Sequence, residues 1–138
     1  MEVNEANDKR AEELLEKGMI DAQQVMQNPA LLNGILAQLE DKLKERPAIE
    51  NRLSSIPLMT EMLKAWGEKE YTEVSDQVIS RLIGAVLYTI KTHDLIWDDI
   101  PVVGIADDLA VMGLALRKSK QELMAFSVWK ESRNAAHF

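Results

Sequence analysis

Apolar residues recur at helical spacing along most of the chain, and this pattern predicts an all-α fold. The clearest stretch begins at Asn28-Pro29, where Asn suits the N-cap and Pro the first turn. Leucines then follow at steps of four, three and four: Leu32, Leu36, Leu39 and Leu43. This pattern predicts an amphipathic helix that ends before Pro47.

Two further helices are predicted from start signals of the same kind. Ser55 and Pro57 precede an apolar face that reaches Trp66, and Gly67 is expected to end this helix. Ser75 is expected to cap a helix over 76–91. Apolar residues lie nearly all round that second helix, so it should occupy the centre of the core: Val78, Ile79, Leu82, Ile83, Ala85, Val86, Leu87 and Ile90.

The remaining segments show weaker helical patterns. Residues 1–17 are acidic and poor in large apolar side chains, so we expect a frayed or loosely docked helix that Gly18 ends. A short helical piece is expected over 49–53, and one long helix from Gly104 that frays near Asn134. Residues 92–104 are too few for an independent element, so the helices on either side should be antiparallel neighbours.

Gly84 and Gly113 fall in the middle of predicted helices, where each costs about 1 kcal/mol relative to alanine. A close approach of two backbones would offset that cost. We therefore expect both glycines to be structural, and we expect Gly113→Leu to lower the melting temperature sharply.

Together these elements predict a single domain over 1–138, a bundle of about five helices with a C-terminal antiparallel hairpin. Residues 1–74 supply the N-terminal helices, 75–118 the core hairpin, and 119–138 the end of the last helix with a frayed tail. No run alternates strictly as a strand would, and no internal repeat is present.

Charge and composition narrow the functional classes. The net charge of −7, from 16 basic and 23 acidic residues, argues against nucleic-acid binding. The absence of cysteine removes disulfides and thiolate chemistry. The acidic N-terminus lacks the apolar segment of a secretory signal, and the uncharged run 82–90 is about half as long as a membrane span. From these features we expect a soluble, cytoplasmic protein.

The segment from Asp94 to Met112 holds five carboxylates and no base. One interpretation is that the acids satisfy free N–H groups at helix starts, with Asp107 and Asp108 in the first turn or so after Gly104. The other is a site for a hard cation such as Mg, Mn or Ca. Its ligands would be Asp94, Asp98, Asp107 and Asp108. We favour capping, and therefore expect no cofactor.

The same segment resembles the signature of the YkvA-like family, a small bacterial and archaeal domain of unknown function. The resemblance lies in Asp94-Leu95-Ile96, Asp98, the run from Ile100 and Pro101 to Gly104, and Asp107-Asp108-Leu109, with Leu82, Ala85 and Tyr88 before them. It covers about residues 75–118. Thr92 and Trp97 stand where the family usually has prolines. The resemblance implies a compact helical hairpin with an acidic turn and supplies no established activity.

Catalysis has little support in the residues. His93 beside Asp94 could act as a general acid or base, but no nucleophile elbow, phosphate loop or H-E-x-x-H motif accompanies it. Trp66 and Trp129 lie on helical stripes and are expected at the core or its edge. Trp97 is a candidate for contact with a protein or a lipid interface.

Our leading hypothesis is a non-enzymatic helical interaction or scaffold module that binds a protein partner or associates with itself as a homo-oligomer. One alternative is a regulatory or hydrolytic protein that uses a divalent cation at the acidic turn. A third is a peripheral membrane protein, because Arg117, Lys118 and Lys120 could meet anionic headgroups.

Overall fold

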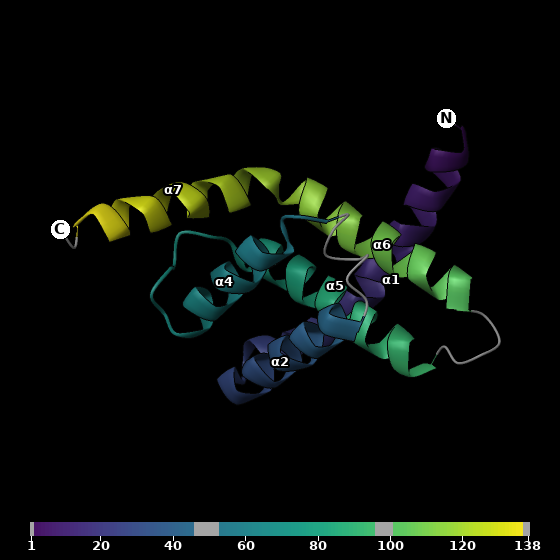
Figure 1. Cartoon of the computed structure of the whole chain (residues 1–138), viewed down its shortest axis with the longest axis horizontal. Coiled ribbons are helices and arrows are strands. Elements are labelled where there is room, and N and C mark those ends of the chain that lie inside the picture. Colours follow the sequence, from purple (N-terminus) through teal and green to yellow (C-terminus); the bar gives the residue numbers. More distant parts are fainter. Residues whose placement is uncertain (1, 46–52, 96–100, 137–138) are drawn as a thin grey trace.

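A computed structural model describes the backbone of residues 2–45, 53–95 and 101–136, and the side chains of residues 9, 11–45, 53–90 and 110–133. Within these residues the chain forms six helices and no strand (Figure 1). The helices are α1 (Glu2–Met26), α2 (Pro29–Glu45), α4 (Ile56–Gly67), α5 (Asp76–Leu95), α6 (Pro101–Lys118) and α7 (Lys120–Ala136). The prediction of an all-α bundle is confirmed.

Local start signals place three of these helices correctly. The Asn28 side-chain oxygen accepts a hydrogen bond from the Leu31 N–H at 3.2 Å, and the Ser75 hydroxyl accepts one from the Val78 N–H at 3.3 Å. Each bond satisfies an N–H group that the first turn leaves free. α4 begins at Ile56 beside Pro57, without a side-chain cap from Ser55, and ends at Gly67 as predicted.

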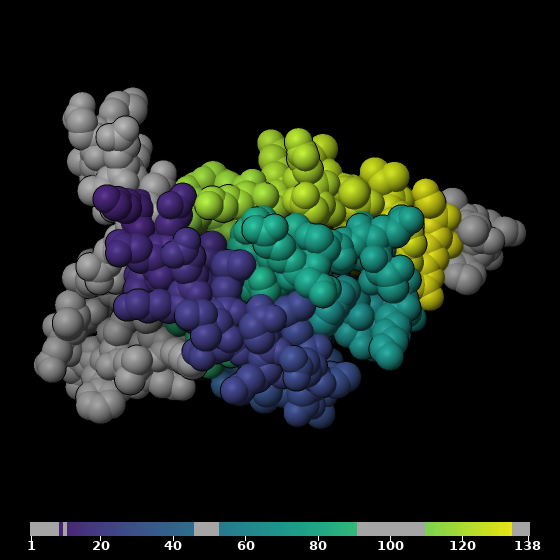
Figure 2. Space-filling view, turned by 180° about the vertical axis from the view of Figure 1, so that it is seen from behind, coloured from purple at the N-terminus to yellow at the C-terminus, as the bar shows by residue number. Residues whose placement is uncertain are grey.

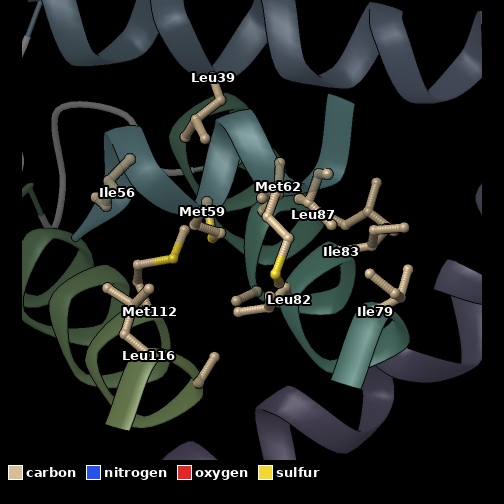
Figure 3. Packing of buried hydrophobic residues seen from close by; sticks show 14 of the residues in the cluster. Leu39, Ile56, Met59, Met62, Ile79, Leu82, Ile83, Leu87, Met112 and Leu116 are labelled. Atoms are coloured by element: carbon tan, nitrogen blue, oxygen red, sulfur yellow. The ribbon is translucent and has the colours of Figure 1, made fainter. Parts of the chain in front are cut away.

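α5 lies at the centre of the core, between α1, α2 and α6 (Figure 1). Ile79, Leu82 and Ile83 are completely buried, as expected for a helix that is apolar nearly all round. Figure 3 shows Leu82 next to Met62 of α4, with Ile83 and Ile79 farther from it, while Met59 of α4 meets Met112 of α6. α5 and α6 run antiparallel, so the predicted hairpin is confirmed.

The expected loosely docked N-terminal helix is wrong. α1 continues through Gly18 to Met26, packs extensively along α5 and lies beside α2 on one face of the molecule (Figure 2). An added Cβ at Gly18 would lie 2.5 Å from the Gly84 carbonyl oxygen, and one at Gly84 would lie 2.8 Å from the Met19 nitrogen. Gly18 is therefore not a helix stop, because it allows two backbones to cross in contact.

The predicted close approach of two backbones is thus confirmed at Gly84, but the same prediction for Gly113 is wrong. An added Cβ at Gly113 would meet Arg117 Nη1 and Leu53 Cδ2 at 3.6 Å, an ordinary van der Waals distance. The site is buried, but it has room for a methyl group. Gly113→Ala should therefore fit, while a sharp loss of stability in Gly113→Leu stays a prediction.

The prediction of one long last helix from Gly104 is also wrong. The helix begins three residues earlier, at Pro101, and is interrupted at Ser119, so it forms α6 and α7. Ser119 is completely buried. Arg81 of α5 donates hydrogen bonds of 3.2 Å to the Lys118 carbonyl oxygen and to the Ser119 hydroxyl. These bonds satisfy groups at the end of α6 and so stabilise the break. Beyond it, α7 extends away from the α5–α6 hairpin towards the C-terminus (Figure 1).

The short helix expected over 49–53 lies outside the described residues except for Leu53, whose backbone is not helical.

Candidate functional site

The acidic turn lies outside the residues whose side chains are described. This holds for the candidate cation ligands Asp94, Asp98, Asp107 and Asp108 and for Trp97, Pro101 and Gly104. Cation binding there stays a prediction. Among the described residues, no group of three histidine or acidic side chains is placed to hold a metal ion.

The backbone nevertheless corrects the capping hypothesis. α6 begins at Pro101 and has no acidic residue in its first turn, so Asp107 and Asp108 lie beyond the free N–H groups. The prediction that Asp107 and Asp108 cap a helix start is therefore wrong. Asp94 lies in the last turn of α5, and the turn over 97–101 that Asp94 or Asp98 was expected to cap lies mostly outside the described residues, so that part of the capping hypothesis stays a prediction.

A cavity of about 540 Å³ lies where the ends of α1 and α4 meet the starts of α2 and α5. Its walls are mainly apolar, and polar side chains stand among them. The lining consists of Val25, Met26, Gln27, Pro29, Leu32, Trp66, Gly67, Lys69, Thr72, Val74 and Asp76. The volume is in the range typical of small-molecule sites.

One wall of this cavity is formed by the C-terminal turn of α4. The Glu70 N–H donates to the Ala65 carbonyl at 2.9 Å and the Lys69 N–H to the Trp66 carbonyl at 3.0 Å. These two bonds define a Schellman motif, in which the residue at the position of Lys69 adopts a left-handed conformation and is usually glycine. Lys69 has a φ of 64°, the one positive φ among non-glycine residues in the described backbone. A lysine there costs stability relative to glycine.

Gly67 also lines the cavity, and a Cβ added there would lie 2.9 Å from Leu32 Cδ2, so a larger residue would have to displace the Leu32 side chain.

α7 is joined to the body by an aromatic cluster of Tyr71, Phe126 and Trp129. Ring centroids lie 5.0 Å apart for Tyr71–Phe126, in an edge-to-face arrangement, and 5.5 Å apart for the stacked pair Phe126–Trp129. Burial raises the pKa of Tyr71 above 10.0, and the negative charges of Glu73 and Glu122 raise it further. The expected positions of Trp66 and Trp129 at the core edge are confirmed.

The outer face of α7 carries the exposed apolar side chains Met124 and Val128, which are 58% and 63% exposed. They are four residues apart and therefore share one face of the helix. Exposed Arg117, Lys118 and Lys120 lie at the end of α6 and the start of α7, and Lys118 Nζ is 3.3 Å from Glu12 Oε1. We use the name α7 outer face for Met124 and Val128 together with the neighbouring bases Lys120, at the start of α7, and Arg117, in the last turn of α6.

Of the remaining motif residues, Gly84 lies at the α1 crossing and Tyr88 is partly buried against the core. Sequence reasoning missed both the cavity and the exposed apolar pair. Met124 and Val128 could have been noticed as apolar positions off the Leu123–Phe126 stripe, whereas the cavity had no local signal.

The chain is similar to a known protein family and to one of its members. Residues 78–114 match a family model described as "Protein of unknown function (DUF1232)". The chain is 32% identical over 84 residues to the "Uncharacterized membrane protein YkvA" of Bacillus subtilis (strain 168). That alignment covers 59% of this chain and 79% of the relative. No solved structure shows a significant match.

The relative's description as a membrane protein contradicts the cytoplasmic location expected from the sequence. Within the described residues, no helix has both the length and the apolar character needed to cross a bilayer. Because the identity extends over most of the relative and the family model matches the predicted signature, the chain belongs to the YkvA-like family of proteins of unknown function.

Proposed function

We propose that this protein is a non-enzymatic helical interaction module that binds the surface of an anionic membrane through the α7 outer face. The observation that carries the proposal is the exposure of Met124 and Val128 on α7, together with the exposed bases Lys120 at the start of α7 and Arg117 in the last turn of α6. Apolar side chains beside bases are typical of segments that lie in a membrane interface. The description of the Bacillus relative as a membrane protein supports the same location.

The arrangement of α7 favours such a role. Its inner face is fixed to the body by Phe126 and Trp129, and by the ion pairs Lys130–Glu61 and Arg133–Glu70. α7 lies at the margin of the molecule beside α4 (Figure 2). The outer face is therefore exposed in the folded protein and needs no unfolding before it contacts another surface.

The expected affinity is modest. Fully burying one Met or Val side chain contributes about 1.5–3 kcal/mol, and a basic residue near an anionic membrane about 1 kcal/mol. Since both apolar side chains are already partly buried, the four residues together supply about 5 kcal/mol, which corresponds to a sub-millimolar dissociation constant. The net charge of −7 opposes approach to an anionic surface, whereas Arg117 and Lys120 are attracted to it. Because these bases take part in the contact, binding should weaken as the fraction of anionic lipid falls.

Flotation with vesicles rich in phosphatidylglycerol, at millimolar lipid, tests the proposal. The natural chain should float, and the double variant Met124→Asp/Val128→Asp should stay at the bottom because it places two charges where apolar contact is needed. Ile20→Asp is the matched control. Ile20 is 73% exposed on α1, outside the α7 outer face, and its variant should still float.

Two results would contradict the proposal. One is a natural chain that never floats. The other is concentration-dependent dimerisation, lost in the double variant, without vesicle binding. In that case the same face would be a contact between two copies of the chain.

A further inference from the structure

The cavity lies between the C-terminal ends of α1 and α4 and the N-terminal ends of α2 and α5. It has an apolar part and a polar part, and one amphipathic small molecule could contact both. Its apolar part is formed by side chains from several helices, chiefly Met26 of α1, Leu32 of α2 and Trp66 of α4. Leu32 is almost completely buried, while Met26 and Trp66 are partly buried against the core. An apolar ligand segment would therefore rest on fixed side chains and needs no opening of the core.

The polar part is asymmetric. Lys69 makes no ion pair within 4 Å and no side-chain hydrogen bond among the described residues, and it is exposed. Asp76, the acid in the cavity wall, lies in the first turn of α5, where the helix dipole and free N–H groups favour a carboxylate. The position of Asp76 favours its negative charge, whereas the ammonium group of Lys69 has no partner among the described residues and can attract an anion.

The backbone of Lys69 supports this assignment independently. Glycine is the usual residue at this position of a Schellman motif, and a left-handed lysine is less stable. Unfavourable backbone conformations of this kind cluster at functional sites. In this protein a lysine takes the position that glycine usually has, and this lysine lies in the wall of the cavity.

We propose that this cavity binds a single-chain amphipathic anion, with its alkyl chain against Met26, Leu32 and Trp66 and its carboxylate or phosphate at Lys69. Thr72 and Gln27 also line the cavity, and their side chains are of types that can hydrogen-bond an anionic group. This site is separate from the α7 outer face, and the proposal does not depend on membrane binding.

Titration of the full chain with dodecanoate below its micellar concentration, without vesicles, tests the proposal. Binding is followed by calorimetry and by tryptophan fluorescence, because Trp66 lines the cavity. We expect saturable binding of dodecanoate and of monododecyl phosphate. Dodecyltrimethylammonium should bind roughly tenfold more weakly or not at all, since a hydrogen-bonded charge pair is lost.

The decisive variant is Lys69→Gly, because its two effects have opposite signs. The melting temperature should rise, since glycine adopts the left-handed conformation without a Cβ penalty, while affinity for dodecanoate should fall roughly tenfold. Lys69→Arg is the matched control. It keeps both the charge and the backbone cost, and should bind within about threefold of the natural chain.

Val74→Trp, which fills the cavity from the connector, should reduce binding of both anions. The proposal is overturned if the natural chain shows no saturable binding, if Lys69→Gly binds dodecanoate as well as the natural chain, or if the cationic detergent binds equally well. A Val74→Trp variant that folds and binds normally would also overturn it, because the ligand would then lie elsewhere. Failure of vesicle flotation would leave these outcomes unaffected.

Discussion

The α1–α5 crossing and the α4–α7 contact join helices in opposite ways. At the crossing, Gly18 and Gly84 remove side chains so that the two backbones touch. At the α4–α7 contact, large rings from the connector and α7 fill the space, and ion pairs lie at the edge. The first contact tolerates no added atom, whereas the second depends on atoms being present. Additions should therefore damage the crossing, and deletions should damage the attachment of α7, which we call the arm.

The largest effect should come from adding one methyl group at the crossing. In Gly84→Ala the new Cβ would lie 2.8 Å from the Met19 nitrogen and 2.9 Å from the Gly18 carbonyl carbon, and a backbone cannot yield as a side chain can. We expect a loss of about 3 kcal/mol or more in the free energy of unfolding. Thermal denaturation measures it.

Gly34→Ala is the matched control, because nothing lies within 4 Å of an added Cβ there. The same substitution should stabilise α2 by about 0.5–1 kcal/mol. Equal effects at the two glycines would show that the crossing is not tight.

The next effect should come from a deletion in the arm. Phe126 is 2% exposed, and Phe126→Ala should cost about 3 kcal/mol in the free energy of unfolding. Because α7 contacts few other elements, its amides should lose protection from hydrogen exchange while those of α5 keep theirs. Uniform loss of protection in both helices would mean that the arm is part of one cooperative unit with the core.

A smaller effect is expected at the junction between the two regions. Arg81→Met removes the donors to the Lys118 carbonyl and the buried Ser119 hydroxyl, and should cost about 1–3 kcal/mol. Lys120→Met, an exposed change beside the junction, is the control and should be nearly neutral. If both variants melt alike, the Arg81 bonds do not stabilise the break in the helix.

The pH dependence of stability offers another comparison. Because the folded-state pKa of Tyr71 is raised above 10.0, its contribution to stability is fully present below pH 10 and is lost as pH rises through the folded-state pKa. The natural chain should lose more stability in this alkaline range than Tyr71→Phe, which has no phenol to ionise. Parallel unfolding curves against pH for the two proteins would contradict the expected raised pKa.

The smallest effect should be at the edge of the arm. Lys130 and Glu61 form an ion pair in which both side chains are nearly half exposed. Glu61→Gln should change the free energy of unfolding by about 0–1 kcal/mol and should matter less in high salt. A loss comparable to that of Phe126→Ala would show that charge, and not ring packing, holds α7.

The sequence by itself determined what depends on neighbours along the chain. Asn28 and Ser75 start α2 and α5 because a cap needs only its own first turn, and the helical spacing of α5 identified it as the central helix. The family signature over the α5–α6 hairpin was equally readable, because its residues are consecutive or one turn apart.

Tertiary structure decided whatever depends on residues far apart in sequence. Gly18 looks like a helix stop until Gly84 is placed against it, and Gly113 has the same local signal as Gly84 without the close neighbour. The helical pattern is interrupted at Ser119, whose hydroxyl accepts a hydrogen bond from Arg81 of α5. The cavity is formed by the ends of four helices, and the left-handed Lys69 lies in its wall. No local pattern encodes that meeting, because the free energy that fixes it comes from packing between elements and not within them.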